Sequence, residues 1–471
     1  MRAHVSARAA LVVLLLWAPR LALAGEEGDE DTCRRPALQL LRAEEDHSSL
    51  RAAACRTELL DPLKYIPLWP ESVYFTLGGD VRERYELVRN PSWGRGKQDP
   101  SGYLLQRYSG HASLHLGPYF RAFVQLRSAL ATGKAAGPGP VDEDTLDVQA
   151  LFLELNSSSG PAFAVMARVG RQEVSYGSSR LISVRDGPNV RRSFDGVRVV
   201  ASLAGWQADA FLLSPVATSR GAFDDWHDPG ETLWGVYVAG ELIPGVVGLD
   251  LYQLSLARRD SSFSGITDDE LRHSLGLRVW GEVSSWDYDV EGVYQVGTFG
   301  SSEIRSWSLA SDVGFRLTRL PGRPRLGLRA NVTSGDVAPS DHVLQTFNPL
   351  YPRGTYYGEA ALMGPQNHVD LHPAVELRLP ANLRVSMDWD FFWRTSLADG
   401  VYAASGALQV PGDRSKARYV GSQVSWDVAW LPVPQATFHL SLAHFFAGPF
   451  LRESGPGRDV DFFAAWLSLH W

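Results

Sequence analysis

Asp459-Val-Asp-Phe-Phe-Ala-Ala-Trp-Leu-Ser-Leu-His-Trp471 is the stretch that decides the fold class. Every second position in it carries an apolar residue, namely Phe463, Ala465, Leu467, Leu469 and Trp471. Successive side chains of a β-strand point to opposite faces, so this spacing predicts a strand with one apolar face. A strand that ends on an aromatic residue is typical of the last strand of an outer-membrane β-barrel, although a soluble β-sandwich can also end on a strand. The recurrence of the pattern upstream decides between these two folds.

Period-two alternation dominates the chain from Val73 onward. Between Val73 and Tyr85 one face carries Val73, Phe75, Leu77 and Val81, and the other carries Thr76, Asp80, Arg82 and Arg84. Between Leu383 and Arg394 the alternation sets large aromatic residues opposite acids and arginines. A soluble sandwich would have to cover or solvate such continuous aromatic stripes. The repeated pattern therefore favours strands that face lipid on one side.

Connections of two kinds separate these strands. Some are tight and rich in Gly and Pro, as at 320–324, and others are long, as at 334–367. Short turns that alternate with long loops are typical of outer-membrane barrels. We count about 18 strands between residues 73 and 471, and closure is required because no strand edge can stay unpaired in hydrocarbon. The sequence predicts an all-β, transmembrane antiparallel barrel with a lumen.

The N-terminus reads as a secretory signal peptide over residues 1–24. Arg2 and Arg8 give the positive flank, Ala9 to Trp17 the apolar stretch, and Ala22-Leu-Ala24 the small-residue cleavage site. After Ala24 there is no run of about 18 apolar residues, which excludes a helical integral membrane protein. An exported chain has three possible destinations: the periplasm, the exterior of the cell and the bacterial outer membrane. The alternating strands favour the outer membrane.

Residues 25–72 form a separate N-terminal segment, which we expect on the periplasmic side. Its leucines with interspersed charges suggest a short helix, and Asp61-Pro62 and Pro67 then lead into extended chain. Cys33 and Cys55 are the two cysteines of the sequence. An oxidising compartment permits a disulfide between them, and two unpaired thiols are the alternative.

Composition limits the functional classes. The 15 Trp, 16 Tyr and 20 Phe suit the aromatic girdles of a barrel, and removal of the signal peptide takes the net charge from −8 to −11, which disfavours nucleic-acid binding. We find no nucleophile elbow, no zinc-protease motif and no phosphate-binding loop, so we predict no catalytic, metal or cofactor site. Asp388 and Asp390 share one face about 7 Å apart, but a pair of lumen acids is a simpler interpretation than glycoside hydrolysis.

Arginine is frequent on the polar faces of the predicted strands. The candidate lumen positions from this alternation are Arg82, Arg84, Arg107, Arg121, Arg127, Arg168, Arg192, Arg198, Arg278, Arg316 and Arg329. One interpretation is that these charges solvate the wall and pair with acids, as in any porin. The other is an electropositive path for anions. Rings of arginine favour anions in a pore, and the planar guanidinium can bind a carboxylate through two hydrogen bonds.

A family resemblance appears in the block 170–196, which contains Gly170-Arg-Gln172 and Asn189-Val-Arg-Arg-Ser-Phe-Asp-Gly196. It resembles the alginate-export family of bacterial outer-membrane barrels, and further stretches at 61–67, 77–85, 351–357 and 364–373 are similar. The resemblance implies an 18-stranded barrel with an arginine-lined constriction for a polyuronate. It also implies that Arg171, in the Gly-Arg-Gln motif, is a pathway residue, and that Arg191 and Arg192, which match the Asn-x-Arg-Arg motif, are further candidates for the path. The leader Asp61-Pro-Leu-Lys-Tyr-Ile-Pro67 is that of a broader branch of the family.

The expected function is passive export of an anionic solute, such as an alginate-like polyuronate, across the outer membrane. A general diffusion porin and a secreted soluble β-protein that binds or hydrolyses carbohydrate are the alternatives. The expected partners are outer-membrane lipid, the anionic solute and, through the last strand, the barrel-assembly machinery.

Overall fold

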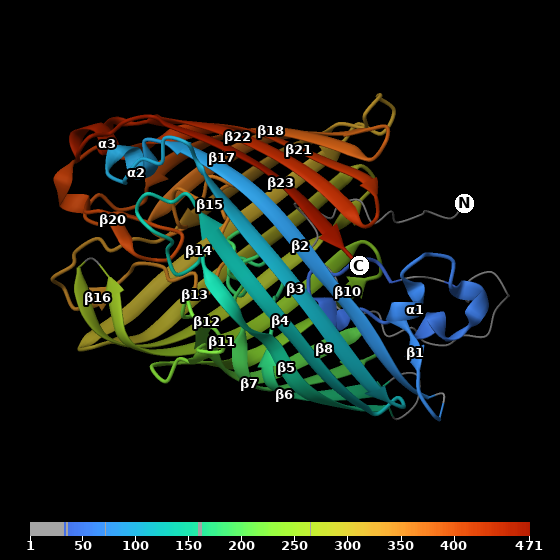
Figure 1. The fold of residues 1–471 in the computed structure, drawn as a ribbon. Coiled ribbons are helices and arrows are strands. Elements are labelled where there is room, and N and C mark those ends of the chain that lie inside the picture. The colour runs from blue at the N-terminus through green and yellow to red at the C-terminus, as the bar shows by residue number, and fades with distance from the viewer. Residues whose placement is uncertain (1–32, 34–35, 71, 159–162, 264) are drawn as a thin grey trace.

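The computed structural model is a closed antiparallel barrel (Figure 1). It describes Cys33 and residues 36–70, 72–158, 163–263 and 265–471, so the predicted signal peptide lies outside the described residues. Eighteen long strands in that part of the chain form the wall: β2 (Val73–Arg89), β3 (Tyr103–Leu116), β4 (Phe120–Thr132), β5 (Asp144–Ser158), β6 (Phe163–Gln172), β7 (Phe194–Leu203), β8 (Trp206–Ala217), β10 (Glu231–Ile243), β11 (Val247–Phe263), β12 (Ile266–Val283), β13 (Trp286–Phe299), β14 (Ser302–Arg316), β15 (Arg325–Thr333), β17 (His368–Leu379), β18 (Leu383–Arg394), β21 (Tyr419–Val433), β22 (Ala436–Ala447) and β23 (Val460–His470).

Each wall strand pairs with its neighbours along the chain, and β2 pairs with β23 to close the ring. This closure confirms the predicted barrel and its strand number. The remaining described elements are short: β1 (Ile66–Pro67), β9 (Trp226–His227), β16 (Val343–Leu344), β19 (Val401–Tyr402), β20 (Leu408–Val410), α1 (Asp61–Lys64), α2 (Pro91–Gly94), α3 (Pro449–Glu453) and the 3-10 turns η1 (Arg42–Glu44), η2 (Ser48–Arg51), η3 (Ala53–Cys55) and η4 (Gly412–Arg414). No helix of the described residues is long and apolar enough to cross a membrane.

The two faces of the strands follow the predicted alternation. Leu77, Leu275 and Trp389 are exposed on the outer face, with Leu275 53% exposed, whereas Thr76 and Arg82 are buried on the inner face. Exposed apolar side chains of this kind stabilise a barrel wall only where lipid surrounds it. The outer face is therefore the lipid-facing surface.

The two ends of the barrel differ in their connections. Three of the connections at one end are 117–119, 204–205 and 434–435, whereas the other end carries 90–102, 173–193 (the β6–β7 loop), 334–367 (the β15–β17 loop) and 395–418. The short-turn end faces the periplasm in outer-membrane barrels, and the long loops face outward. The N-terminal segment lies at the short-turn end, on the right of Figure 1.

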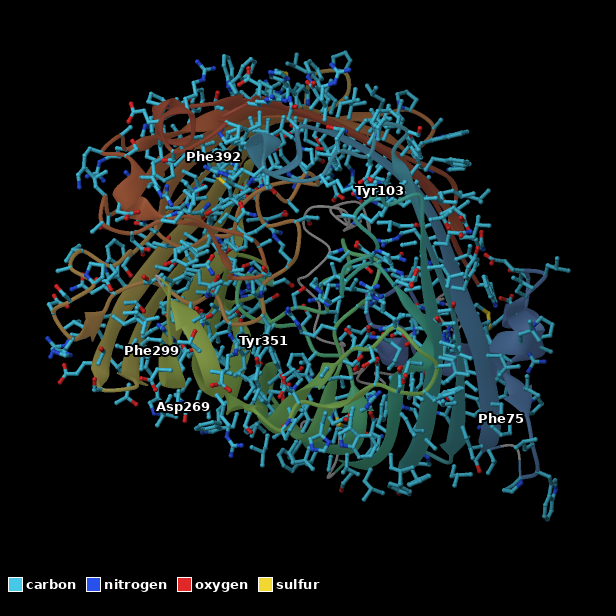
Figure 2. The ribbon with its side chains drawn as sticks, turned by 60° about the vertical axis from the view of Figure 1, so that its left-hand side comes forward. Phe75, Tyr103, Asp269, Phe299, Tyr351 and Phe392 are labelled. Carbon is cyan, nitrogen blue, oxygen red and sulfur yellow. A yellow bond between two sulfur atoms is a disulfide. The ribbon has the colours of Figure 1, made fainter. Side chains whose placement is uncertain are left out.

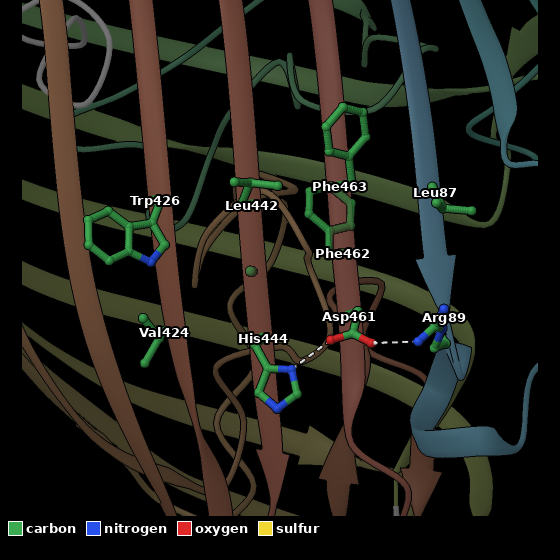
Figure 3. Close-up of a pocket in the computed structure, with 10 residues that line it drawn as sticks. Leu87, Arg89, Val424, Trp426, Leu442, His444, Asp461, Phe462 and Phe463 are labelled. Atoms are coloured by element: carbon green, nitrogen blue, oxygen red, sulfur yellow. Dashed lines mark hydrogen bonds and ion pairs between the residues drawn. The ribbon is translucent and has the colours of Figure 1, made fainter.

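A shallow depression crosses the outer wall next to the closing strands (Figure 3). Its lining includes Leu87 of β2, Trp426 of β21, Leu442 of β22 and Phe463 of β23, which are apolar. The depression belongs to the lipid-facing surface. The predicted lipid-facing position of Phe463 agrees with this placement.

The N-terminal segment is held together by a disulfide between Cys33 and Cys55, which decides between the two alternatives that the sequence left open. Leu50 and Cys55 of the segment pack with Tyr65 and Tyr74, the last at the start of the barrel. The segment is thereby fixed to the base of β2.

Candidate functional site

The β6–β7 loop crosses the lumen from one wall to the other. On one side, the Asp186 carboxylate accepts a hydrogen bond from Arg107 Nη2 (2.8 Å) and the Asp186 carbonyl accepts one from Arg82 Nη1 (2.8 Å). On the other side, Arg180 Nη1 lies 3.0 Å from the carboxylate of Asp289, which β13 carries. Because β2, β3 and β13 lie far apart around the ring of 18 strands, the loop spans the interior.

The β15–β17 loop lies against the β6–β7 loop inside the barrel. The Ser183 amide donates to the Tyr351 carbonyl (2.9 Å), and the Tyr351 amide donates to the Leu181 carbonyl (2.8 Å). A further bond joins the Arg353 amide to the Ser179 carbonyl (3.1 Å). Figure 2 shows Tyr351 within the ring of strands. We call these two hydrogen-bonded segments the crossing loops, and the part of the lumen that they cross is called the constriction below.

Most of the arginines predicted to line the lumen make ion pairs with acids of the wall or of the crossing loops. The pairs are Arg84 with Glu86 and Glu359, Arg107 with Asp186, Arg121 with Glu154, Arg127 with Asp144 and Asp225, Arg168 with Glu154 and Glu44, Arg191 with Glu173 and Asp186, Arg198 with Asp209, Arg278 with Asp250 and Asp289, Arg316 with Asp287, and Arg329 with Asp388. Arg82 donates to the carbonyls of Asp186 and Pro188. For these positions the simpler interpretation, charge pairing along the wall, describes what the structure contains.

Arg171 does not lie where the family motif led us to expect it. It pairs across the sheet with Leu151, and both it and Val169 belong to the outward register, in which Leu151 and Val169 are exposed. Its guanidinium is bound to Asp195 (Nε–Oδ1 2.9 Å) and to the carbonyl of Val148 (3.1 Å). Cross-strand neighbours share a face, so Arg171 sits at the rim of the outer register rather than in the lumen.

Arg192 was expected on a strand, but β7 begins only at Phe194, and Arg192 belongs to the β6–β7 loop. Its guanidinium lies over the ring of Tyr351, with 5.0 Å between the guanidinium carbon and the ring centroid. The neighbouring Arg191 is bound to Glu173 and to the carbonyl of Leu40. The two adjacent arginines therefore have different partners: an aromatic ring for Arg192, and a carboxylate and a backbone carbonyl for Arg191.

Three guanidinium groups of the crossing loops, those of Arg185, Arg192 and Arg353, have no carboxylate within ion-pair distance among the described residues. Burial lowers the pKa of Arg192 to about 9, with further lowering from the charges of Arg185 and Arg258. Burial lowers the pKa of Arg185 and of Arg353 to about 10, and neighbouring arginines add to this effect. Each pKa remains above neutral, so the constriction carries uncompensated positive charge that an anion would stabilise.

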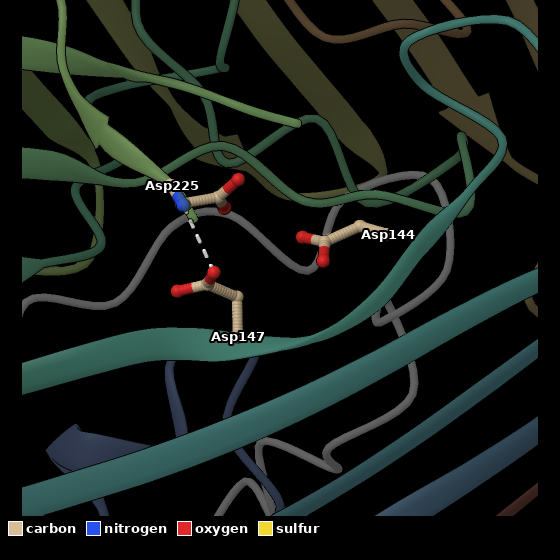
Figure 4. Close-up of side chains that lie close together, drawn as sticks. All are labelled: Asp144, Asp147 and Asp225. Carbon is tan, nitrogen blue, oxygen red and sulfur yellow. Dashed lines mark hydrogen bonds between the residues drawn. The ribbon is translucent and has the colours of Figure 1, made fainter. Parts of the chain in front are cut away.

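Three acids meet near the rim, Asp144, Asp147 and Asp225, with ligand atoms within 4.8 Å of one another (Figure 4). Two arginines of the chain already lie against these acids: Arg127 binds Asp144 and is 3.5 Å from Asp225, and Arg171 is 3.5 Å from Asp147. Backbone amides of 224 and 225 also donate to Asp147. Burial raises the pKa of Asp225 to about 7. The cluster anchors the loop between β8 and β10 to the wall, and we assign no metal to it.

Comparison with known proteins identifies the family. The family model described as alginate export matches residues 73–464. This chain belongs to the alginate-export family. A search of curated proteins finds no match.

Solved structures share the fold of this family member at low sequence identity. They include Acinetobacter baumannii OccAB1 (11% identity, TM-score 0.57, 87% of this chain and 98% of that chain). Pseudomonas aeruginosa OpdK, solved with vanillate, has 12% identity and a TM-score of 0.56 over 84% of this chain and 98% of that chain. Pseudomonas aeruginosa OccK2 (OpdF), in complex with glucuronate, has 12% identity and a TM-score of 0.56 over 85% and 96%. The chain is an outer-membrane channel of the alginate-export family.

In this alginate-export barrel, the sequence reasoning missed several residues of the constriction. Arg180, Arg185, Asp186 and Arg353 lie in loops, where no period-two alternation marks an inward face. The motif block 170–196 and the Tyr351-Pro-Arg-Gly354 stretch contain these residues. The motifs therefore located the constriction without identifying its unpaired charges.

Proposed function

We propose that this channel passes carboxylated solutes downhill through the constriction formed by the crossing loops. The observation that carries the proposal is the set of three guanidinium groups, Arg185, Arg192 and Arg353, without carboxylate partners among the described residues. A carboxylate in transit would supply the missing counter-charge. The acids that pair with the wall arginines keep the remainder of the path from binding anions too tightly, as conduction requires.

The chemistry of arginine favours carboxylates over simple halides. The planar guanidinium presents parallel N–H donors that match the two oxygens of a carboxylate. These features support a role in binding and passage and not in catalysis.

The related structures guide the choice of solute. OccK2 was solved with glucuronate and OpdK with vanillate, and both compounds carry a carboxylate. The family description is alginate export, and alginate is a polymer of uronate units. We therefore propose uronate as the recognised unit, with an acidic polysaccharide such as an alginate-like polyuronate as the exported form. A general diffusion porin is the second candidate, which the extensive pairing of the wall arginines favours.

The test is the reversal potential in planar bilayers for the wild type and for the double variant Arg192→Gln with Arg353→Gln. These two positions are chosen because their removal leaves no wall acid without its partner. Arg305→Gln is the matched control, since Arg305 is exposed and pairs with Glu303 away from the constriction. We expect anion preference in the wild type and in the control, and a shift toward cations in the double variant.

Added solutes distinguish a monomer channel from a polymer channel. Block of the wild-type current by glucuronate and by a polyuronate supports polysaccharide passage, and block by glucuronate alone supports small uronates. Cation preference in the wild type, or equal behaviour of all three proteins, would instead indicate the general diffusion porin.

A further inference from the structure

The N-terminal segment enters the lumen and reaches the constriction. The carbonyl of Leu40 accepts a hydrogen bond from Arg191 Nη2 (2.9 Å), which belongs to the β6–β7 loop. The carbonyl of Ala43 accepts one from Arg121 Nη1 (2.7 Å), on β4. Residues 40–45 therefore lie inside the barrel, between its periplasmic mouth and the crossing loops.

Glu44 of this segment lies against three arginines of the wall. Its Oε1 is 2.9 Å from Arg168 Nη1 and 4.0 Å from Arg198 Nη1. Burial would raise the pKa of Glu44, but the charges of Arg168, Arg198 and Arg121 lower it to about 2. The carboxylate is ionised throughout the physiological range, and its side chain remains 21% exposed.

The charges of the wall leave a place for one carboxylate. Glu154 lies 3.0 Å from Arg121 and 2.6 Å from Arg168, and Asp209 lies 2.6 Å from Arg198. Three guanidinium groups and two wall carboxylates leave one positive charge, which Glu44 neutralises. The three arginines, Arg121, Arg168 and Arg198, are called the arginine triad below.

An apolar surface lies beside this charge. The ring centroid of Phe152 is 4.2 Å from the guanidinium carbon of Arg168 and 5.4 Å from that of Arg121. Phe123 stacks on Phe152, with 5.1 Å between the ring centroids. Both rings are buried, and Ala43 of the segment packs against them. Displacement of residues 40–45 would therefore uncover an aromatic face next to a carboxylate-binding cation, on which a sugar ring that carries a carboxylate can pack.

We propose that the arginine triad is a second carboxylate-binding site of the channel, on the periplasmic side of the crossing loops, and that Glu44 occupies it as an internal ligand. A uronate that arrives from the periplasm competes with Glu44 for the triad and displaces residues 40–45 from the lumen. The segment thus narrows the periplasmic entrance of the channel when no solute is present, and current still passes beside it. This inference rests on the proposed passage of carboxylated solutes and adds to it the entry site and its competitor.

The first test compares glucuronate block in the wild type, in Glu44→Gln and in the control Asp46→Asn. Asp46→Asn removes the same charge from the same segment. Asp46 is exposed, however, and its carboxylate accepts a hydrogen bond from the Ser48 amide and not from the triad. Loss of the internal competitor should lower the half-blocking concentration of glucuronate added on the periplasmic side by roughly tenfold in Glu44→Gln only. Equal half-blocking concentrations in all three proteins would overturn the internal-ligand proposal.

The second test does not depend on conductance. Ala43→Cys places a thiol beside Glu44, and the native cysteines are joined to each other. Glucuronate should increase the rate at which a water-soluble maleimide labels Cys at this position, and chloride at equal ionic strength should not. Labelling that is the same in both salts would show Glu44 to be a permanent anchor. A wild-type channel that prefers cations would contradict the proposed function itself, whereas anion preference without any effect at Glu44 would contradict this inference alone.

Discussion

Asp186→Asn is the most informative single substitution for the constriction. Asp186 is bound through its carboxylate to Arg107 and lies 3.3 Å from Arg191, while its backbone carbonyl holds Arg82. The amide retains the shape of the side chain, and the carbonyl contact is unchanged. The substitution should therefore leave the β6–β7 loop in place and add one positive charge to the constriction.

The expected change in the ratio of anion to cation permeability follows from Coulomb's law. A unit charge roughly 8 Å from a permeating ion in water contributes about 0.5 kcal/mol, and screening at 0.15 M salt reduces this to about 0.2 kcal/mol. Anion and cation feel it with opposite signs, so the ratio of anion to cation permeability should rise about sixfold at low salt and about twofold at 0.15 M. The side chain of Asp186 is 43% exposed, which justifies the high dielectric constant of this estimate.

The assay is the reversal potential under a potassium chloride gradient, measured at both salt concentrations. Asp461→Asn is the control, because Asp461 pairs with Arg89 at the extracellular end of the outer wall and its loss makes the same change in net charge. A permeability ratio that does not change in Asp186→Asn, or that changes equally in Asp461→Asn, would refute the reasoning that the crossing loops set the selectivity.

Three further predictions concern stability and insertion. Deletion of Trp471 removes its two backbone hydrogen bonds with Gly79, a loss of about 2 kcal/mol. It should lower the yield of the heat-modifiable inserted form more than it changes the conductance of each inserted channel. Arg394→Lys should destabilise the barrel by ~3 kcal/mol in a thermal unfolding assay without changing the reversal potential. The guanidinium of Arg394 stacks on Phe450, with 3.9 Å to the ring centroid, and donates hydrogen bonds to the carbonyls of Leu397, Asp399, Gly412, Ser415 and Ala417. The pKa of Glu44 is lowered from 4.5 to about 2, so its contact should be complete above pH 4.5 and lost as the pH falls toward 2; proteolysis of residues 40–45 that rises already between pH 7 and pH 5 would contradict this sign.

The sequence predicted the wall far better than the constriction. In a strand, the fixed alternation of side chains connects position with face, so Leu77 and Arg82 could be assigned to opposite sides from their spacing. The connection 334–367 was likewise predicted with the bounds that β15 and β17 give it. Loops have no such period. The inward position of Arg353 depends on backbone hydrogen bonds to residues far away in the chain, and Arg171 lies in an outward register that its motif does not reveal.

The last residue of the chain joins three parts of the molecule at one point. The Trp471 carbonyl accepts hydrogen bonds from the Gly79 amide (2.9 Å) on the first wall strand and from Arg42 Nη2 (3.1 Å) on the N-terminal segment. One backbone group therefore serves both the seam of the ring and the N-terminal segment, so a disturbance of the closing strand also reaches the residues that lie in the lumen.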